Sequence, residues 1–204
     1  MKKRIIVDIG SSAYPLQAYG VGDDNAEAYL FEPRDDFYKE LEDEFGHKEN
    51  FHLNQLALSD SIGTATFYAT QKRNCSSLLE PNDKNELISR EARGGDFLNY
   101  ETYDVKVDTL DNFLGHLERV DYMKIDTQGN EYQILKAGTE LLKRTKFLKV
   151  EVHTTEFYKG QKLKNDFYEL LEPLGFKFSG QTVGPNVQFE DLFFENTREL
   201  NHVI

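Results

Sequence analysis

The chain has 204 residues, with 36 acidic and 24 basic side chains and a formal net charge of −12. This length suits one domain with a sizeable core, and the negative charge disfavours sequence-independent binding to the phosphates of nucleic acids. The single cysteine, Cys75, excludes an intramolecular disulfide and, with no signal pattern and no run of about 20 apolar residues, predicts a cytoplasmic protein without a membrane partner.

Apolar segments typical of buried strands occur at residues 4–9, 27–31, 50–58, 120–126 and 146–152. Residues 35–45 place apolar side chains four apart from Phe37 to Phe45 behind an acidic first turn, which predicts an amphipathic helix. Residues 130–142 and 166–174 predict two further helices. Because strands alternate with helices, we expect a doubly wound, mostly parallel α/β sheet.

Three segments depart from this alternation. Residues 62–69 alternate at period two directly after the third strand, which predicts an added antiparallel strand. Residues 176–180 and 187–195 predict a C-terminal antiparallel hairpin. Residues 70–104 are polar, and a connection of that length in a compact domain is usually functional or disordered. We therefore expect a single domain over residues 1–204, in which 70–104 forms a lid or substrate insert.

Three predicted strands end close to an acidic residue: Asp8, Glu32 and Asp126. Because ligands of parallel sheets bind outside the carboxyl ends of the strands, these acids mark a candidate nucleoside site. Gly10 and Ser11 begin a turn of small residues, where a ligand can approach the backbone. Glu32 ends the second strand, where an acidic side chain accepts hydrogen bonds from ribose hydroxyls.

Two classes of cofactor would use such an acid. A dinucleotide needs several glycines against its diphosphate, and the turn Gly10-Ser11-Ser12 lacks the full Gly-x-Gly-x-x-Gly pattern. S-adenosylmethionine carries no phosphate and tolerates serines at this turn. The sequence therefore favours S-adenosylmethionine, and nicotinamide-dependent reduction is the least favoured alternative.

Further motifs follow in order along the chain. They are Val7-Asp8-Ile9-Gly10-Ser11-Ser12, Phe31-Glu32-Pro33, Ala57-Leu58-Ser59-Asp60, Asn74 with Ser76-Ser77-Leu78, Thr109-Leu110-Asp111, Met123-Lys124-Ile125-Asp126-Thr127-Gln128-Gly129 with Glu131, Val150-Glu151-Val152, and Asp191-Leu192-Phe193-Phe194-Glu195-Asn196. The ordered set resembles the FkbM-type family of S-adenosylmethionine-dependent methyltransferases.

This resemblance implies a seven-stranded sheet of the class I methyltransferase, Rossmann-like type. It also implies methyl transfer to a hydroxyl of a sugar, polysaccharide or secondary metabolite. The cofactor contacts that it implies are Asp8, Gly10 and Ser11 at the methionine part, Glu32 at the ribose, Ala57 and Leu58 near the adenine, and Asp126 close to the methyl-transfer point.

A hydroxyl that attacks a methyl group must lose its proton to a nearby base. Asp126 is one candidate and His153, at the end of the fifth strand, is the other; a satisfied residue at a strand end is an equal interpretation of His153. Glu151 lies on the same strand face as His153, where it can orient the ring or help hold a divalent ion. No two ligands share a characteristic metal spacing, so we assign no metal ligand.

The segment Ala13-Tyr14-Pro15 lacks the second glycine usual in the family and interrupts the expected helix. A shortened helix with an intact pocket is the favoured interpretation. The alternative is a non-catalytic nucleoside-binding or interaction domain with a methyltransferase fold. For the enzyme, we expect a small-molecule or glycan acceptor and no nucleic-acid partner.

Overall fold

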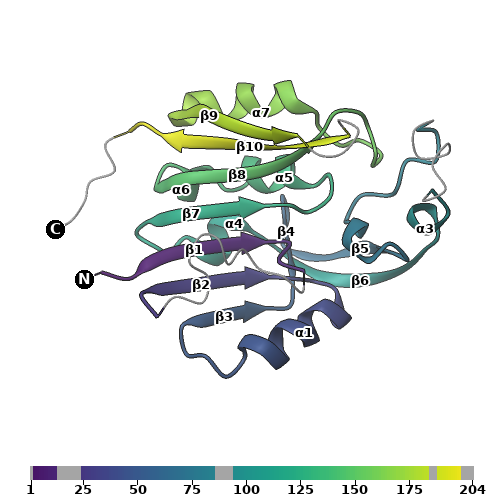
Figure 1. The fold of residues 1–204 in the computed structure, drawn as a ribbon, viewed down its shortest axis with the longest axis horizontal. Helices are drawn as coiled ribbons and strands as arrows, with labels where there is room; N and C mark the ends of the chain where they lie inside the picture. The colour runs from purple at the N-terminus through teal and green to yellow at the C-terminus, as the bar shows by residue number, and fades with distance from the viewer. Residues whose placement is uncertain (1, 13–23, 86–93, 184–187, 199–204) are drawn as a thin grey trace.

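The computed structural model describes residues 2–12, 24–85, 94–183 and 188–198, and its strands form two sheets (Figure 1). The larger sheet has seven strands in the order β3-β2-β1-β7-β8-β10-β9. These strands are β1 (Arg4–Ile9), β2 (Ala26–Phe31), β3 (Phe51–Asn54), β7 (Val120–Ile125), β8 (Thr145–His153), β9 (Phe176–Val183) and β10 (Phe189–Asn196). The first five in spatial order pair in parallel, whereas β10 runs antiparallel to both β8 and β9. The predicted mostly parallel sheet with a terminal hairpin is thus confirmed.

The smaller sheet has the order β4-β6-β5 and consists of β4 (Ala57–Ser59), β5 (Gly63–Thr70) and β6 (Tyr100–Thr109). Figure 1 shows it beyond the carboxyl ends of β1, β2 and β7. The strand expected at 62–69 is therefore present as β5, and its antiparallel partner is β6. The prediction of a single strand over 50–58 was wrong, because the chain leaves the large sheet after Asn54 and enters the small sheet at Ala57.

Within the described ranges the α-helices are α1 (Asp35–Phe45), α3 (Gly94–Leu98), α4 (Leu110–Leu114), α5 (Glu131–Lys136), α6 (Thr139–Leu142) and α7 (Lys164–Leu171), with the 3-10 turns η2 (Arg73–Cys75) and η3 (Glu172–Leu174). The helix expected at 130–142 is thus divided into α5 and α6. The break falls at Gly138, where a Cβ would lie 2.3 Å from Leu110 of α4, so close packing between helices requires glycine there. The helix expected at 166–174 begins two residues earlier and ends in η3 around Pro173.

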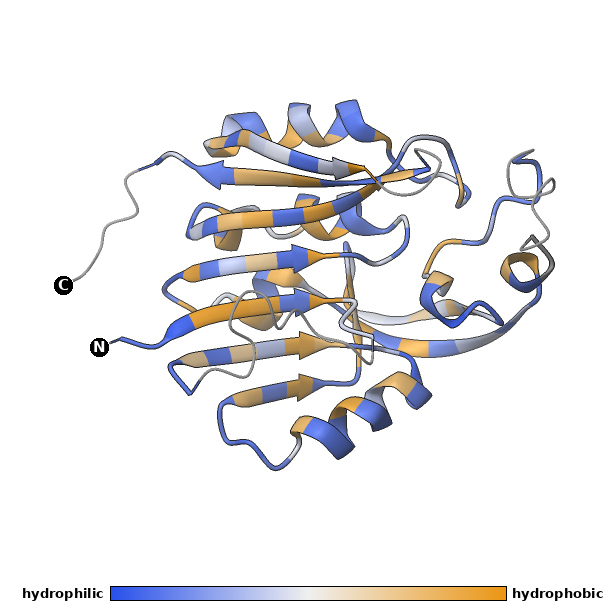
Figure 2. Cartoon of the chain, viewed as in Figure 1, coloured by the Kyte–Doolittle hydropathy of each residue, from blue (hydrophilic) through white to orange (hydrophobic). Residues whose placement is uncertain are grey.

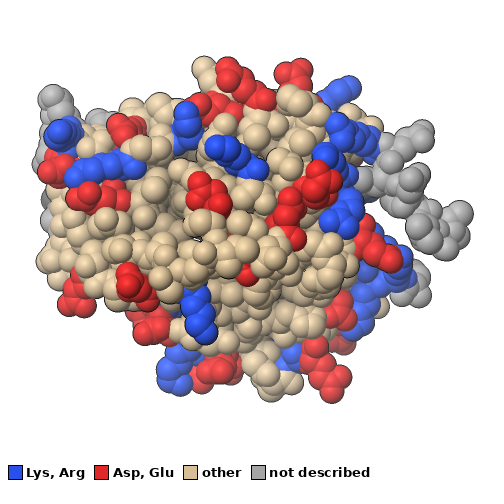
Figure 3. Space-filling model, turned by 180° about the vertical axis from the view of Figure 1, so that it is seen from behind, with Lys and Arg blue, Asp and Glu red and all other residues tan. Residues whose placement is uncertain are grey.

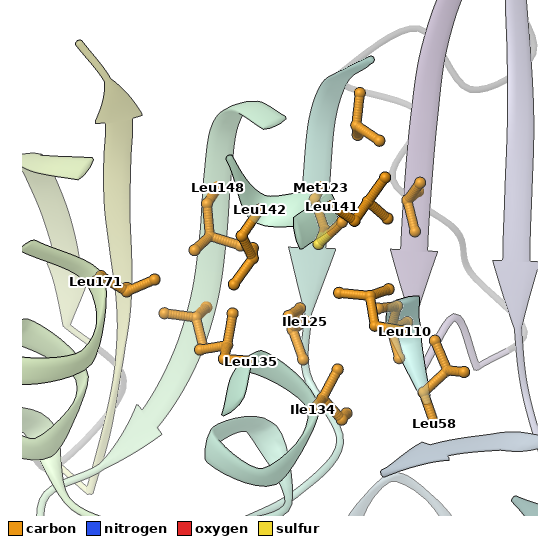
Figure 4. Close-up of a cluster of buried hydrophobic side chains, with 14 of the residues drawn as sticks. Leu58, Leu110, Met123, Ile125, Ile134, Leu135, Leu141, Leu142, Leu148 and Leu171 are labelled. Atoms are coloured by element: carbon orange, nitrogen blue, oxygen red, sulfur yellow. The ribbon is translucent and has the colours of Figure 1, made fainter. Parts of the chain in front are cut away.

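Alternating residues of the large sheet face two separate cores. Val7 and Ile9 pack in a cluster with side chains of α4, α5, α6 and α7, shown in part in Figure 4. Ile6 packs on the opposite face with Leu41 and Phe45 of α1. Figure 2 shows the apolar residues concentrated in the strands and on the inner sides of these helices. Within the described ranges, no helix is both long enough and apolar enough to span a bilayer.

The close approach of β1 to β7 depends on Gly10. Its φ is 74°, and a Cβ on Gly10 would lie 1.9 Å from the backbone oxygen of Asp126. The sequence suggested that this glycine admits a ligand. In the structure the backbone of the next strand occupies the space beside it, so Gly10 first of all permits the two strand ends to meet.

We predict that Gly10→Ala lowers the free energy of unfolding by about 2–4 kcal/mol, because it adds both a left-handed strain and a backbone clash. Urea denaturation would measure this loss. Gly160→Ala is the matched control, since Gly160 has a φ of 79° but nothing within 4 Å of its Cβ position. A Gly10→Ala loss no larger than that of the control would contradict the proposed clash.

Candidate active site

A cavity of about 390 Å³ lies at the carboxyl ends of β1, β2, β7 and β8, where the small sheet closes over the large one. Its volume falls in the usual range for small-molecule sites. The lining includes Gly10, Glu32, Ala57, Leu58, Asp126 and His153. Six of the residues predicted from the sequence therefore meet in one cavity, although they come from five separate segments of the chain.

Glu32 follows β2 and has a carboxylate fixed by two backbone groups. One oxygen accepts a hydrogen bond from the Ser12 N–H at 2.8 Å, and the other accepts from the Arg34 N–H at 2.9 Å. Each carboxylate oxygen has a further lone pair available to a ligand. Burial raises the pKa of Glu32 to about 7, although both hydrogen bonds oppose this rise.

An apolar wall lies beside Glu32. It is formed by Phe31, Phe37, Leu56, Ala57 and Leu58. Ala57 and Leu58 belong to β4. The Asn130 side chain donates a hydrogen bond to the Leu58 carbonyl at 3.0 Å. This bond ties β4 to the start of α5, so the apolar wall is attached to the segment that follows β7.

Behind the cavity, Lys124 and Asp8 form a buried ion pair at 3.1 Å. The Lys124 ammonium also donates to the Gly10 carbonyl at 2.6 Å and lies 3.6 Å from Asp126. Burial disfavours its charge, but Asp8 and Asp126 hold the pKa of Lys124 above its ordinary value. The same ammonium holds the pKa of Asp126 below its ordinary value despite burial. Asp126 is therefore an ionised carboxylate at neutral pH.

The loop after β7 is held by Glu131. Its buried carboxylate accepts from the Thr127 N–H at 2.7 Å and from the Gly129 N–H at 2.9 Å. Glu131 and Lys124 thus both bond to neighbouring groups and not to each other. In the same loop, Gln128 has a φ of 61° and donates from Nε2 to Asp126 at 3.0 Å and to Glu151 at 2.7 Å.

The far end of the cavity contains Glu151, His153 and aromatic rings. His153 lies against the rings of Phe157 and Tyr158, and its Nδ1 is buried without a hydrogen-bond partner among the described residues. Burial lowers the pKa of His153 to about 4, so its ring is neutral at pH 7. The Tyr158 hydroxyl lies 2.9 Å from both the Cys75 carbonyl and the Gln128 side-chain oxygen.

Part of the polar segment 70–104 borders the same cavity through Lys72, Arg73, Asn74, Cys75 and Ser76. Arg34 donates to the Thr70 carbonyl at 2.9 Å and to the Ser76 hydroxyl at 2.7 Å, and Arg73 pairs with Asp36 and Glu40 of α1. The segment also contains the beginning of β6, which the sequence interpretation missed. The role of residues 70–104 as a lid stays a prediction.

Two predicted cofactor residues, Asp8 and Ser11, do not line the cavity. Asp8 supports it from behind through Lys124, and the Ser11 hydroxyl donates to the Asp8 carbonyl at 2.9 Å. The segment Ala13-Tyr14-Pro15 lies outside the described residues. Gln128 received no role from the sequence, because its contact with Tyr158 joins residues 30 positions apart and leaves no local pattern.

No group of three or more His, Cys, Asp or Glu side chains in the described part of the chain is arranged to hold a metal ion. The cavity instead combines the Glu32 carboxylate after β2, an apolar wall, and two carboxyl groups with a neutral imidazole at the ends of β7 and β8. Such an arrangement can bind a nucleoside through Glu32 and can accept a proton at Asp126, Glu151 or His153.

Comparisons with known proteins identify the family and the fold. Residues 11–178 match the model of the methyltransferase FkbM domain. Magnesium protoporphyrin IX methyltransferase (ChlM) from Synechocystis PCC 6803, solved with bound SAM, superimposes with a TM-score of 0.51 at 10% identity, over 96% of this chain and 71% of that one. The fibrillarin/Nop5p complex gives a TM-score of 0.52 at 12% identity, over 96% and 74%. None of the curated proteins matches the chain in sequence.

At these identities the solved structures establish the fold, which is the class I methyltransferase, Rossmann-like fold expected from the sequence. The family match covers most of the chain and includes Glu32, Ala57, Leu58, Asp126 and His153. The predicted family is thus confirmed, and the chain belongs to the FkbM family of S-adenosylmethionine-dependent methyltransferases.

Proposed function

We propose that this protein is an O-methyltransferase that transfers the methyl group of S-adenosylmethionine to a hydroxyl of a sugar, polysaccharide or secondary metabolite. The observation that carries the proposal is that Glu32, after β2, and Asp126 and His153, at the ends of β7 and β8, line one cavity from different strands of the sheet. Glu32 is suited to a ribose, and Asp126 and His153 are suited to a hydroxyl that loses its proton.

The cavity residues fit the cofactor. Glu32 has one free lone pair on each oxygen for the ribose hydroxyls, and Ala57 and Leu58 offer an apolar surface to the adenine. The ionised Asp126 carboxylate complements a cationic sulfonium, which supplies the electrophilic methyl group when the cofactor is bound. Asp8 and Ser11 serve the methionine part indirectly, since they hold the turn that carries Gly10.

The acceptor end supports a hydroxyl substrate. Asp126 and His153 are both unprotonated at neutral pH and can accept a hydrogen bond from an incoming hydroxyl. Phe97 and Phe157 lie beside them in the lining, and aromatic rings pack well on the apolar faces of sugars and aglycones. These groups orient the acceptor, and the apolar surroundings limit competition from water.

The surface supports a small-molecule or glycan acceptor more than a nucleic acid. The net charge of −12 opposes phosphate backbones, and acidic and basic side chains are interspersed on the face shown in Figure 3. Cys75 is a free thiol. We therefore place the reaction in a reducing compartment, the cytoplasm.

Calorimetry with S-adenosylmethionine and S-adenosylhomocysteine tests the cofactor assignment. We expect micromolar binding of both, and at least a tenfold loss of affinity in Glu32→Ala, because charged hydrogen bonds to the ribose are worth about 1.5–3 kcal/mol each. Glu27→Ala is the matched control, since Glu27 lies at the opposite end of the same strand and pairs with Lys3 and His52. No binding by the wild-type protein would favour the non-catalytic alternative.

The transfer site is tested by Asp126→Ala and His153→Ala in assays of S-adenosylhomocysteine release with a panel of hydroxylated acceptors. We expect turnover to fall about 10²- to 10⁴-fold in at least one variant, with cofactor affinity changed far less. Glu190→Gln serves as the control, because Glu190 pairs with Lys164 and does not line the cavity. Wild-type turnover in both alanine variants would refute the proposed roles.

A further inference from the structure

Beside Asp126 the cavity contains a second acidic group, Glu151, to which the proposed reaction has so far given no role. Glu151 lies in β8, two residues before His153, and its side chain lines the cavity although the residue is only 8% exposed. It shares one amide with Asp126: Gln128 Nε2 donates to Glu151 Oε1 at 2.7 Å and to Asp126 Oδ1 at 3.0 Å. Glu151 is therefore held beside the predicted transfer point.

The Gln128 amide is itself firmly placed. Its backbone adopts a left-handed conformation that non-glycine residues seldom use, and its side-chain oxygen meets the hydroxyl of the fully buried Tyr158. Strain of this kind persists where surrounding contacts enforce it, commonly at functional sites. The structure thus fixes both carboxyl groups at once instead of leaving Glu151 free to turn away.

The charges around Glu151 are unbalanced. Three other carboxyl groups act on it, from Asp126 after β7, Glu131 of α5 and Asp191 of β10. Lys124 pairs with Asp8 and Asp126 and acts on Glu151 only through space, and Lys149 pairs with Asp191. No Lys or Arg of the described residues forms an ion pair with Glu151.

Such surroundings favour the protonated form of a buried carboxyl group. Burial, followed by repulsion from the Asp126 and Glu131 carboxylates, raises the pKa of Glu151 well above its ordinary value. The pKa values of the two predicted bases are lowered instead. The Lys124 ammonium stabilises the charge of Asp126, and burial keeps the His153 ring neutral. Both hold a transferred proton weakly, whereas an ionised Glu151 would hold it strongly.

We propose that Glu151 accepts the hydroxyl proton in methyl transfer, and that Glu151 gives up its resting proton when the cationic cofactor binds. As the acceptor oxygen bonds to the methyl carbon, the carbon–sulfur bond breaks and its electron pair stays on sulfur. The hydroxyl proton passes to a carboxylate oxygen of Glu151. The positive charge is lost from the cavity in the same step, so the protonated state of Glu151 becomes favourable again. This inference rests on the proposed function.

Proton release on cofactor binding tests the inference without an acceptor. Calorimetry at pH 7 in two buffers of different ionisation enthalpy gives the number of protons released. Glu32 also releases protons when its carboxylate binds a ribose, but it does so equally for S-adenosylmethionine and S-adenosylhomocysteine. We therefore expect wild-type protein to release up to about one more proton with the cationic ligand than with the neutral one, as linkage requires.

The variant Glu151→Gln should abolish this difference while still binding both ligands, and Glu190→Gln should retain it. At low pH the binding of S-adenosylmethionine must displace a proton from Glu151. The affinity for S-adenosylmethionine divided by that for S-adenosylhomocysteine should therefore rise with pH until Glu151 ionises in the free protein. In Glu151→Gln this ratio should not change with pH. Turnover of Glu151→Gln should fall about 10²- to 10⁴-fold.

The outcomes separate the two proposals. If neither ligand binds, the methyltransferase function fails. If both bind with equal proton release by the wild-type protein, or if Glu151→Gln turns over at the wild-type rate, the role of Glu151 is wrong while the methyltransferase function stands. A difference that survives in Glu151→Gln would assign the released proton to another carboxyl group and would equally overturn the inference.

Discussion

The buried ion pair between Lys124 and Asp8 is the interaction on which the site depends. It joins β7 to β1, and the same ammonium bonds the carbonyl of Gly10. Removing one partner of a buried pair leaves an uncompensated charge and costs about 3–5 kcal/mol. Gly10 in turn leads to Ser12, whose N–H fixes Glu32. The Lys124 ammonium thus links the ends of β7 and β1 directly, and the turn after β1 links them to Glu32 after β2.

The same cation separates the pKa values of the neighbouring acidic groups. Asp126 lies 3.6 Å from Lys124, which lowers the pKa of Asp126, whereas Glu151 has no ion-pair partner among the described residues and burial raises its pKa. Two carboxyl groups that share one amide donor therefore have pKa values shifted in opposite directions. Environments that separate the proton affinities of neighbouring acids are typical of sites that move protons. The arrangement follows from strand order, since β7 lies directly between β1 and β8.

The sequence was sufficient for the strands of the large sheet and for the acidic residues at their ends, because buried parallel strands appear as apolar runs and carboxyl ends share one edge. The sequence was insufficient where an element depends on partners that lie far away along the chain. β6 alternates charged and apolar residues and is stabilised by β4 and β5, so its own segment gives a weak signal. The break at Gly138 depends on Leu110, which lies in another helix. Likewise, only the folded structure reveals that Gln128 links Asp126 to Glu151, and that Asp8 acts through Lys124.

The division of residues 51–59 between two sheets has a mechanical consequence. β4 follows β3 after only two residues, yet it pairs with β6, and its residues Ala57 and Leu58 form part of the cavity wall. The small sheet has its own apolar cluster around Phe67, Val105 and Val107, separate from the two clusters of the large sheet. Ala57 belongs to this small cluster and Leu58 to the largest one, so β4 couples the packing of the two sheets at the cavity wall.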